Sequence, residues 1–239
     1  VRRACSGIVK HGVSVAYASG VHTGLEAAVR RNIMGGLGLM TEQISQQNHD
    51  ALGCNGWEIS AHANSAPDHE PIQGLQYSDA AYEELNNSLV RRIGTLNCGH
   101  VASPIILGVT RPQYTAAELE QFRQDNEKGV TFDGRHYTGY EATQMQRRME
   151  RAIRAQKRRV LLAGPEDAAP RKSRLVLLQQ EYRSFSDGVG LRTEDERLEV
   201  SGFGPKQMKQ LLLEKPASST VLTPEVIKPP EPPELPDPP

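Results

Sequence analysis

The fold of this chain depends on one short stretch, Trp57-Glu58-Ile59-Ser60-Ala61-His62. Asn55-Gly56 marks a turn just before it, and residues 57–61 predict a short strand that delivers His62 at its carboxyl end. Two prolines and Gly74 follow between residues 64 and 77, and they predict an ordered loop in place of a helix or a strand. The stretch therefore predicts a strand that leads directly into a long irregular loop.

Polar side chains gather in this loop and in a second stretch, Asn97-Cys98-Gly99-His100. The chain has seven histidines and three cysteines, yet these two stretches hold His62, His69, His100 and Cys98. Because a strand, a loop and a helix connect the two stretches, we expect their polar groups to converge on one surface. Such a surface is either a chemical site or a polar network that fixes the loop.

We interpret these residues first as a network that locks the loop into one conformation. Imidazoles and an amide can both donate and accept hydrogen bonds to loop carbonyls, and glycine allows a backbone conformation that other residues resist. A loop of this length inside a compact domain needs such anchors, because its buried amides are otherwise unpaired. The predicted network consists of His62, His69, Gln73, Gly74, Cys98 and His100. On this interpretation no catalytic role is assigned, and neither a cofactor nor a metal ion is expected.

Two chemical alternatives use the same residues. In the first, His62 and His69 act as general base and general acid in metal-independent phosphodiester cleavage, with His100 as a further candidate. That chemistry needs a positive group beside the histidines, and position 66 of the loop is alanine, so an arginine of the long helix would have to supply it. In the second, Cys98 and His100 bind zinc in an interaction module, although the chain contains no Cys-x-x-Cys and no His-x3-His spacing.

The rest of the chain is predicted to be mostly helical. Apolar periodicity and capping signals predict helices at residues 25–33, 41–52, 79–94, 115–127, 138–162, 170–185 and 205–213. Two further β elements are expected, a strand at residues 13–17 and a hairpin at residues 129–139 around Asp133-Gly134. The run Gly35-Gly36-Leu37-Gly38 is expected to interrupt the first helical region as a hinge.

The longest predicted helix has two different faces. At about 100° per residue, one sector holds Arg147, Arg151, Arg154 and Arg158. The opposite sector holds Met145, Met149, Ile153 and Val160, which should pack on the protein body. The arginine row is either a solvated helix face or a contact surface for an acidic partner or for phosphate groups. No aromatic residues and no reader motif accompany it, so recognition of bases is not expected.

Composition sets the wider limits. The net charge is −1, with 37% hydrophobic and 24% charged residues, so the chain as a whole has no strong attraction to nucleic acid or membranes. Three widely spaced cysteines argue against a disulfide framework, and no stretch approaches the ~18 apolar residues of a membrane helix. Because the first residue is valine, we interpret the chain as a fragment or a processed product.

We therefore expect an α+β fold, with a helix-rich domain that contains a few short strands over residues 1–164. A helical extension is expected over residues 165–215. Residues 216–239 include nine prolines and are expected to form a disordered tail with polyproline character, since they cannot bury a core.

Taken in order, these residues resemble the phage minor capsid protein 2 family of tailed bacteriophages, which is related to the Mu-type head morphogenesis proteins. The resemblance covers roughly residues 10–165 and rests on the series Tyr17-x-Ser19-Gly20, Ala27-Ala28-Val29-Arg30-Arg31, Ile59-Ser60-Ala61-His62, Pro67, His69, Gln73-Gly74, Asn97-Cys98-x-His100, Pro104, Gly108, Tyr137, Tyr140, Glu141 and Gln144. The family usually has arginine, tryptophan and arginine where this chain has Ala66, Ile72 and Gly99. Losing two arginines beside the histidines weakens an inherited catalytic role more than it weakens the fold.

The resemblance implies a low-copy structural component of the virion that lies inside the head near the portal and acts in head assembly, DNA packaging or ejection. Its implied partners are the phage portal protein, the major capsid protein or both, and packaged DNA through the basic helix, with no membrane contact. Its implied location is the phage head, and the bacterial host cytoplasm during assembly. Some relatives of Mu-type head proteins carry toxin or nuclease domains, so the phosphodiester-cleaving alternative stays open. Family members also begin with additional amino-terminal helices, which fits a truncated chain.

Overall fold

The structure, a computed structural model, describes residues 14–18, 20, 22–95 and 98–204. Its helices are α2 (Leu25–Leu52), α3 (Asp79–Ser88), α4 (Ala116–Lys128), α5 (Gly139–Leu161), α6 (Pro165–Gly188) and the 3-10 helix η1 (Asp195–Leu198). Its strands are β1 (Ser14–Ala16), β2 (His22–Gly24), β3 (Gly56–Ile59), β4 (Gln76–Ser78), β5 (Ala102–Ile105), β6 (Val130–Phe132) and β7 (Arg135–Tyr137). This content confirms the predicted α+β class. The predicted helix at 205–213 and the predicted disordered tail at 216–239 lie outside the described residues.

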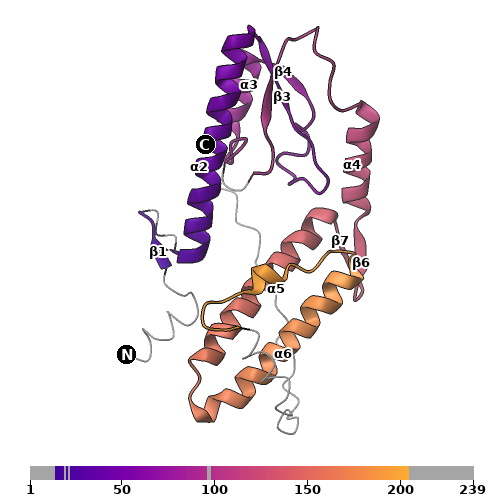
Figure 1. The fold of residues 1–239 in the computed structure, drawn as a ribbon. Coiled ribbons are helices and arrows are strands. Elements are labelled where there is room, and N and C mark those ends of the chain that lie inside the picture. Colours follow the sequence, from indigo (N-terminus) through magenta and orange to yellow (C-terminus); the bar gives the residue numbers. More distant parts are fainter. Residues whose placement is uncertain (1–13, 19, 21, 96–97, 205–239) are drawn as a thin grey trace, which may run out of the picture.

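The strands form three small antiparallel sheets, β1 with β2, β4-β3-β5, and β6 with β7. Figure 1 shows the three-stranded sheet beside α2 and α3 at one end of the molecule, and the α5–α6 hairpin at the other. Helix α4 leads from the first group to the second. The end of the sheet that carries the long loop therefore lies on the side of α4 and the start of α5.

Strand β3 is the centre of the three-stranded sheet, and all four of its residues are buried. Trp57 lies opposite Tyr77 on β4 and Pro104 on β5. A proline cannot donate to a sheet, so it fits the edge position that β5 holds. A strand is present where it was predicted, but it ends at Ile59 and not at residue 61, so His62 lies three residues beyond its carboxyl end.

Helix α2 corrects the prediction that glycines would interrupt it, because it runs unbroken for 28 residues. Gly38 faces the turn that contains Gly94, and a Cβ at Gly38 would overlap the carbonyl oxygen of Gly94. Glycine at position 38 therefore lets α2 approach the backbone of the turn closely. This close packing outweighs the low helix propensity of glycine. Arg92 of the same turn pairs with Glu42 of α2 at 3.3 Å.

Two other helix boundaries differ from the prediction. Helix α3 ends at Ser88 and not at residue 94, because the buried side chain of Asn86 accepts a hydrogen bond from the backbone N–H of Ile93 at 2.8 Å and turns the chain. Helix α6 begins at Pro165, where the missing N–H costs nothing. Pro170 then lies inside the helix, which loses one backbone hydrogen bond there.

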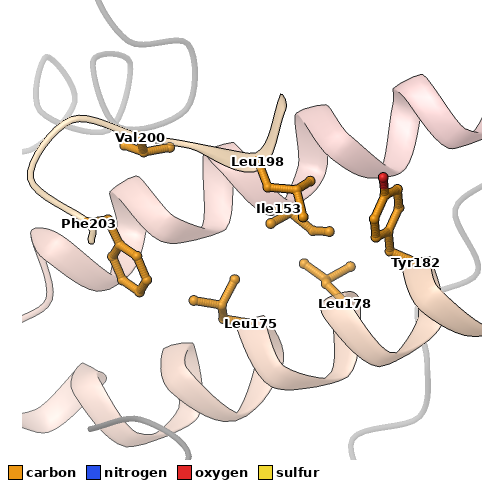
Figure 2. Packing of buried hydrophobic residues seen from close by; sticks show 7 residues of the cluster. All are labelled: Ile153, Leu175, Leu178, Tyr182, Leu198, Val200 and Phe203. Carbon is orange, nitrogen blue, oxygen red and sulfur yellow. The ribbon is translucent and has the colours of Figure 1, made fainter. Parts of the chain in front are cut away.

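The main hydrophobic core lies between α5 and α6 and crosses the domain boundary predicted at residue 164. Figure 2 shows Leu175, Leu178 and Tyr182 of α6 pointing toward Ile153 of α5. A covering segment closes the core with its side chains Leu198, Val200 and Phe203. The division into a domain at 1–164 and an extension at 165–215 stays a prediction, with the first part of the extension sharing this core.

A polar bridge connects the long loop to the hairpin core. The buried side chain of Asn126 on α4 donates to Glu70 of the loop at 2.9 Å and accepts from the backbone N–H of Tyr140 on α5 at 2.8 Å. The capping box predicted at Thr138 and Glu141 starts α5 beside this bridge. The loop is therefore held by contacts outside its own sheet as well as within it.

The two faces of α2 predict opposite effects for two neighbouring glycine substitutions. Gly36→Ala should raise the free energy of unfolding by roughly 0.5–1 kcal/mol, because nothing lies within contact distance of the new methyl and alanine favours helix. Gly38→Ala should lower it by roughly 1–3 kcal/mol, because the Gly94 carbonyl must move. Urea unfolding of both variants checks this, and an equal gain in both would contradict the close contact.

Candidate functional site

The candidate site lies where the loop after β3 meets the segment before β5. The backbone N–H of Ser60 donates to the carbonyl of Val101 at 2.8 Å, and the Ser60 hydroxyl accepts from the N–H of Val101 at 2.9 Å. This pair extends the β3–β5 contact by one step beyond the strands. It brings the residues that follow Ser60 and those that precede Val101 together, as the sequence predicts.

Helical turns inside the loop place two of the predicted residues on one side. The N–H groups of His69 and Glu70 donate to the carbonyl of Ala66, and the N–H of Gln73 donates to the carbonyl of His69 at 3.1 Å. Residues four apart in such turns lie on the same face, so His69 and Gln73 point the same way. Gly74 closes the loop with a φ of +70° and donates to the carbonyl of Ile59 at 2.7 Å.

His100 is at the centre of the cluster and only 2% exposed. Its Nε2 lies 3.1 Å from the Gln73 Oε1 and 3.4 Å from the Ser65 Oγ. The His62 ring stacks on it with centroids 4.3 Å apart, and the His69 ring meets it edge-on at 5.2 Å. The ring of His100 is therefore surrounded by Ser65 and by four residues of the predicted network, which are His62, His69, Gln73 and Cys98.

The hydrogen bonds of His69 define its tautomer. Its Nε2 lies 2.8 Å from the carbonyl oxygen of Arg91. A carbonyl can only accept, so Nε2 carries the proton and Nδ1 has a free lone pair. That Nδ1 lies 3.3 Å from the Cys98 Sγ and 3.3 Å from the Nδ1 of His100.

The tautomer of His100 follows from the orientation of Gln73. The backbone N–H of His62 donates to the Gln73 Oε1 at 3.0 Å, and a backbone amide cannot accept, so this atom is the oxygen. The His100 Nε2 beside the same oxygen must then carry the proton. The Nδ1 of His100 is left with a lone pair, 3.4 Å from the Cys98 Sγ. Two lone pairs and one sulfur therefore face one point.

The surroundings keep the His100 ring neutral. Burial lowers the pKa of His100 to about 4, and His62, His69 and the positive charge of Arg91 act in the same direction. The carboxylate of Asp68, which pairs with the Arg91 guanidinium at 2.8 Å, raises the pKa of His100, but by less than these groups lower it. Near neutral pH the ring is therefore an uncharged imidazole, the form in which histidine binds metals.

This geometry does not provide the pair of imidazoles that acid–base cleavage requires. His69 is 1% exposed, and both of its ring nitrogens already face protein atoms. The His62 ring stacks against His100, and its Nδ1 lies 2.9 Å from the carbonyl of Ala63. A substrate could not reach the two rings together without displacing His100. The hydrogen bonds of these residues instead join the loop to its neighbours and form a Cys/His cluster, and the loop-locking role stays a prediction.

The predicted arginine row is partly engaged within the protein. Arg147 pairs at 2.6 Å with the buried carboxylate of Glu150, and Arg154 donates to the carbonyl of Arg197. Arg151 is exposed, and Arg158 is half-buried. Arg147 therefore pairs within α5, and Arg154 joins α5 to the segment that covers the core.

The sequence analysis missed a row of exposed apolar residues on α2. This row, called the α2 stripe below, recurs every three or four residues and consists of Leu25, Val29, Ile33, Leu37, Met40 and Ile44. Each of these six residues is 45% to 59% exposed. The opposite face, toward the protein, carries small or polar residues, including Ala28, Gly38 and His49. The spacing was visible in the sequence, but the expected break at the glycines hid it.

The lowered pKa of His100 predicts a loss of stability in acid. The ring has a pKa of about 4 in the folded protein, against its usual value of 6.5. Between these values the unfolded chain binds the proton more readily, so this contribution is complete above about pH 6.5 and is lost as the pH falls toward 4. The loss should approach ~3 kcal/mol. Urea unfolding across this range, with a chelator present, measures it.

The control for this prediction is a pair of histidine variants. His100→Asn should remove the pH dependence, whereas the exposed His136→Asn should keep it. An unchanged slope in His100→Asn would show that another group titrates in this range.

Comparison with known proteins adds the identity of the family. The sequence model of one protein family, described as Phage minor capsid protein 2, matches residues 1–187. No curated protein and no solved structure matches the chain. Among the described residues, no helix is both long and apolar enough to cross a membrane. Since the match covers well over half of the 239 residues, the chain belongs to the phage minor capsid protein 2 family and is a structural protein of a bacteriophage.

Proposed function

We propose that this protein is a low-copy component of a tailed-phage head that lies near the portal, inside the head, and acts in head assembly, DNA packaging or ejection. Family membership supports a structural role in the virion. The observation that carries the more specific proposal is the α2 stripe, because a head component must present a surface to other subunits. The occupant that we assign to this surface is the phage portal protein.

The α2 stripe has the dimensions of a docking surface. From Leu25 to Ile44 it runs along about 30 Å of helix, at 1.5 Å per residue. Its members follow one another at intervals of three or four residues, so they form a continuous seam on one face. Contiguous apolar surface of this kind marks interaction sites in soluble proteins. A helix with such a seam fits an apolar groove or a second helix on the partner.

The inner face of α2 supports a docking role for the outer face. A helix that only supported its own domain would turn its large apolar residues inward. Here Gly38 and Ala28 face the domain, and Leu37 and Ile33 face away from it. Figure 1 shows α2 along one side of the molecule, with α3 and the central sheet on its other side. The arrangement suits a helix that is shared between this chain and a neighbouring subunit.

Contact with packaged DNA is a second, narrower proposal. Arg147 donates to Glu150, and Arg154 donates to the Arg197 carbonyl. Phosphate contact by the arginine row would therefore depend chiefly on Arg151, which is exposed. One exposed arginine contributes a small, salt-dependent attraction to phosphate. The portal contact therefore ranks above DNA contact in this proposal.

Substitutions in the α2 stripe should reduce incorporation of the protein into phage particles. The double variant Ile33→Gln, Leu37→Gln places two polar groups in the middle of the seam, where they would have to be desolvated on docking. Copies per gradient-purified particle, measured by quantitative mass spectrometry, should fall at least severalfold. Thermal stability of the isolated protein should hardly change, because both side chains are about half exposed.

The matched control replaces two exposed apolar residues elsewhere. Val109→Gln, Leu177→Gln removes a similar amount of exposed apolar surface from a loop and from α6. Incorporation of this control should match that of the unmodified protein. A photo-crosslinking residue in place of Met40 identifies the occupant of the stripe. Crosslinks to the portal support the proposal, whereas crosslinks only to the major capsid protein or to a second copy of this chain would overturn the portal assignment.

A further inference from the structure

We propose that His69, Cys98 and His100 bind a zinc ion. Their ligand atoms are the two Nδ1 atoms and the Sγ, and the three are mutually close. The two Nδ1 atoms are 3.3 Å apart, and the sulfur lies 3.3 Å from the first and 3.4 Å from the second. Among the described residues, these three form a group whose ligand atoms all lie within 4.8 Å of one another. The inference rests on this geometry alone and does not depend on the function proposed above.

The separations match those around a tetrahedral zinc ion. Zinc binds imidazole nitrogen at about 2.0–2.1 Å and thiolate sulfur at about 2.3 Å. Tetrahedral angles then place two nitrogens about 3.3 Å apart, and a nitrogen and a sulfur about 3.6 Å apart. The observed triangle agrees with these values to within about 0.3 Å. Little rearrangement of the three side chains is needed to bring them to one ion.

The outer hydrogen bonds of both histidines aim their lone pairs at the same point. The Arg91 carbonyl holds the proton of His69 on Nε2, and the Gln73 amide oxygen holds that of His100 on Nε2. Metal-binding histidines usually donate their second nitrogen in this way, which fixes the tautomer and the ring orientation. Each of these acceptors is itself held, one by the Asp68 ion pair to the Arg91 side chain and the other by the N–H of His62.

With both imidazole rings neutral, protein hydrogens alone cannot satisfy the cluster. The two Nδ1 lone pairs face each other at 3.3 Å, and both face the same sulfur. A Cys98 thiol carries one hydrogen, so it can donate to one nitrogen and leaves the other acceptor facing an acceptor. A buried acceptor without a donor costs free energy. A cation with three coordinate bonds satisfies both nitrogens and the thiolate at once.

Ligand chemistry favours zinc over magnesium and calcium. Thiolate and imidazole are the donors that zinc takes in structural and catalytic sites, whereas magnesium and calcium require oxygen donors. With three protein ligands from the described residues, the fourth tetrahedral position falls to a water molecule or to another donor. The ion would join the loop residue His69 to the segment at Cys98–His100, 29 residues further along the chain. Its role is to clamp these two segments together.

Metal analysis of purified protein tests the site directly. The protein is dialysed against zinc sulfate and then against metal-free buffer, and bound zinc is measured by mass spectrometry. We expect one zinc ion per chain, and a melting temperature that rises with free zinc, since binding to the folded state alone stabilises it. Cobalt in place of zinc should give a thiolate-to-cobalt charge-transfer absorption. Absence of bound zinc at micromolar free zinc would overturn the proposal.

The chain offers a matched control for the cysteine ligand. Cys98→Ser should lose the cobalt absorption and bind zinc more than about 100-fold more weakly, because a direct ligand counts for more than an outer-shell partner. Cys54→Ser removes the other described, partly buried free cysteine and should keep full binding. Equal zinc binding in the two variants would overturn the assignment.

A measurement on the unmodified protein decides the matter if Cys98→Ser does not fold. A thiol-alkylating reagent is applied with zinc or with a chelator, and the modified peptides are quantified by mass spectrometry. Zinc should slow alkylation of Cys98 at least tenfold and leave that of Cys54 unchanged, since a metal-bound thiolate reacts poorly. Equal protection of both cysteines, or of neither, would overturn the proposal.

Discussion

The amide oxygen of Gln73 accepts hydrogen bonds from two donors, the backbone N–H of His62 at 3.0 Å and the ring Nε2 of His100 at 3.1 Å. One donor belongs to the start of the loop and the other to the segment before β5, so this atom holds both to the end of the loop. It also determines which nitrogen of His100 carries the proton. The lone pair that His100 directs at Cys98 therefore depends on this acceptor, and that of His69 depends on the Arg91 carbonyl.

Local sequence signals predicted those parts of the fold whose causes are local. The capping boxes at Thr115 and Thr138 are both formed, and the predicted hairpin turns at Asp133 and Gly134, each with positive φ. The continuity of α2 could not be predicted in this way. Its glycines lower helix propensity, but Gly38 is there because the Gly94 carbonyl approaches from a distant segment, and only the folded structure reveals that contact.

The same distinction applies to the candidate site. The residue types and their spacing predicted that His62, His69, Gln73, Cys98 and His100 would converge, because a strand, a loop and a helix connect the two stretches that hold them. The acceptor that sets the tautomer of His69 is the main-chain carbonyl of Arg91. Every residue has such a carbonyl, so the sequence does not indicate which one accepts this hydrogen bond. Periodicity likewise placed the arginines of α5 on one face but could not show that Arg154 donates to the covering segment.

The close contact between Gly38 of α2 and the Gly94 carbonyl has a mechanical consequence. The turn that touches α2 also contains Thr95, whose carbonyl accepts from the N–H of Cys98 at 2.7 Å. No side chain lies between α2 and the turn. A shift of α2 is therefore passed directly to the backbone of the turn and is not absorbed by side-chain movement. If another subunit pulled on the outer surface of α2, the force would therefore reach Cys98 through the backbone of the turn. The position of α2 and the position of the Cys/His cluster are in that sense mechanically coupled.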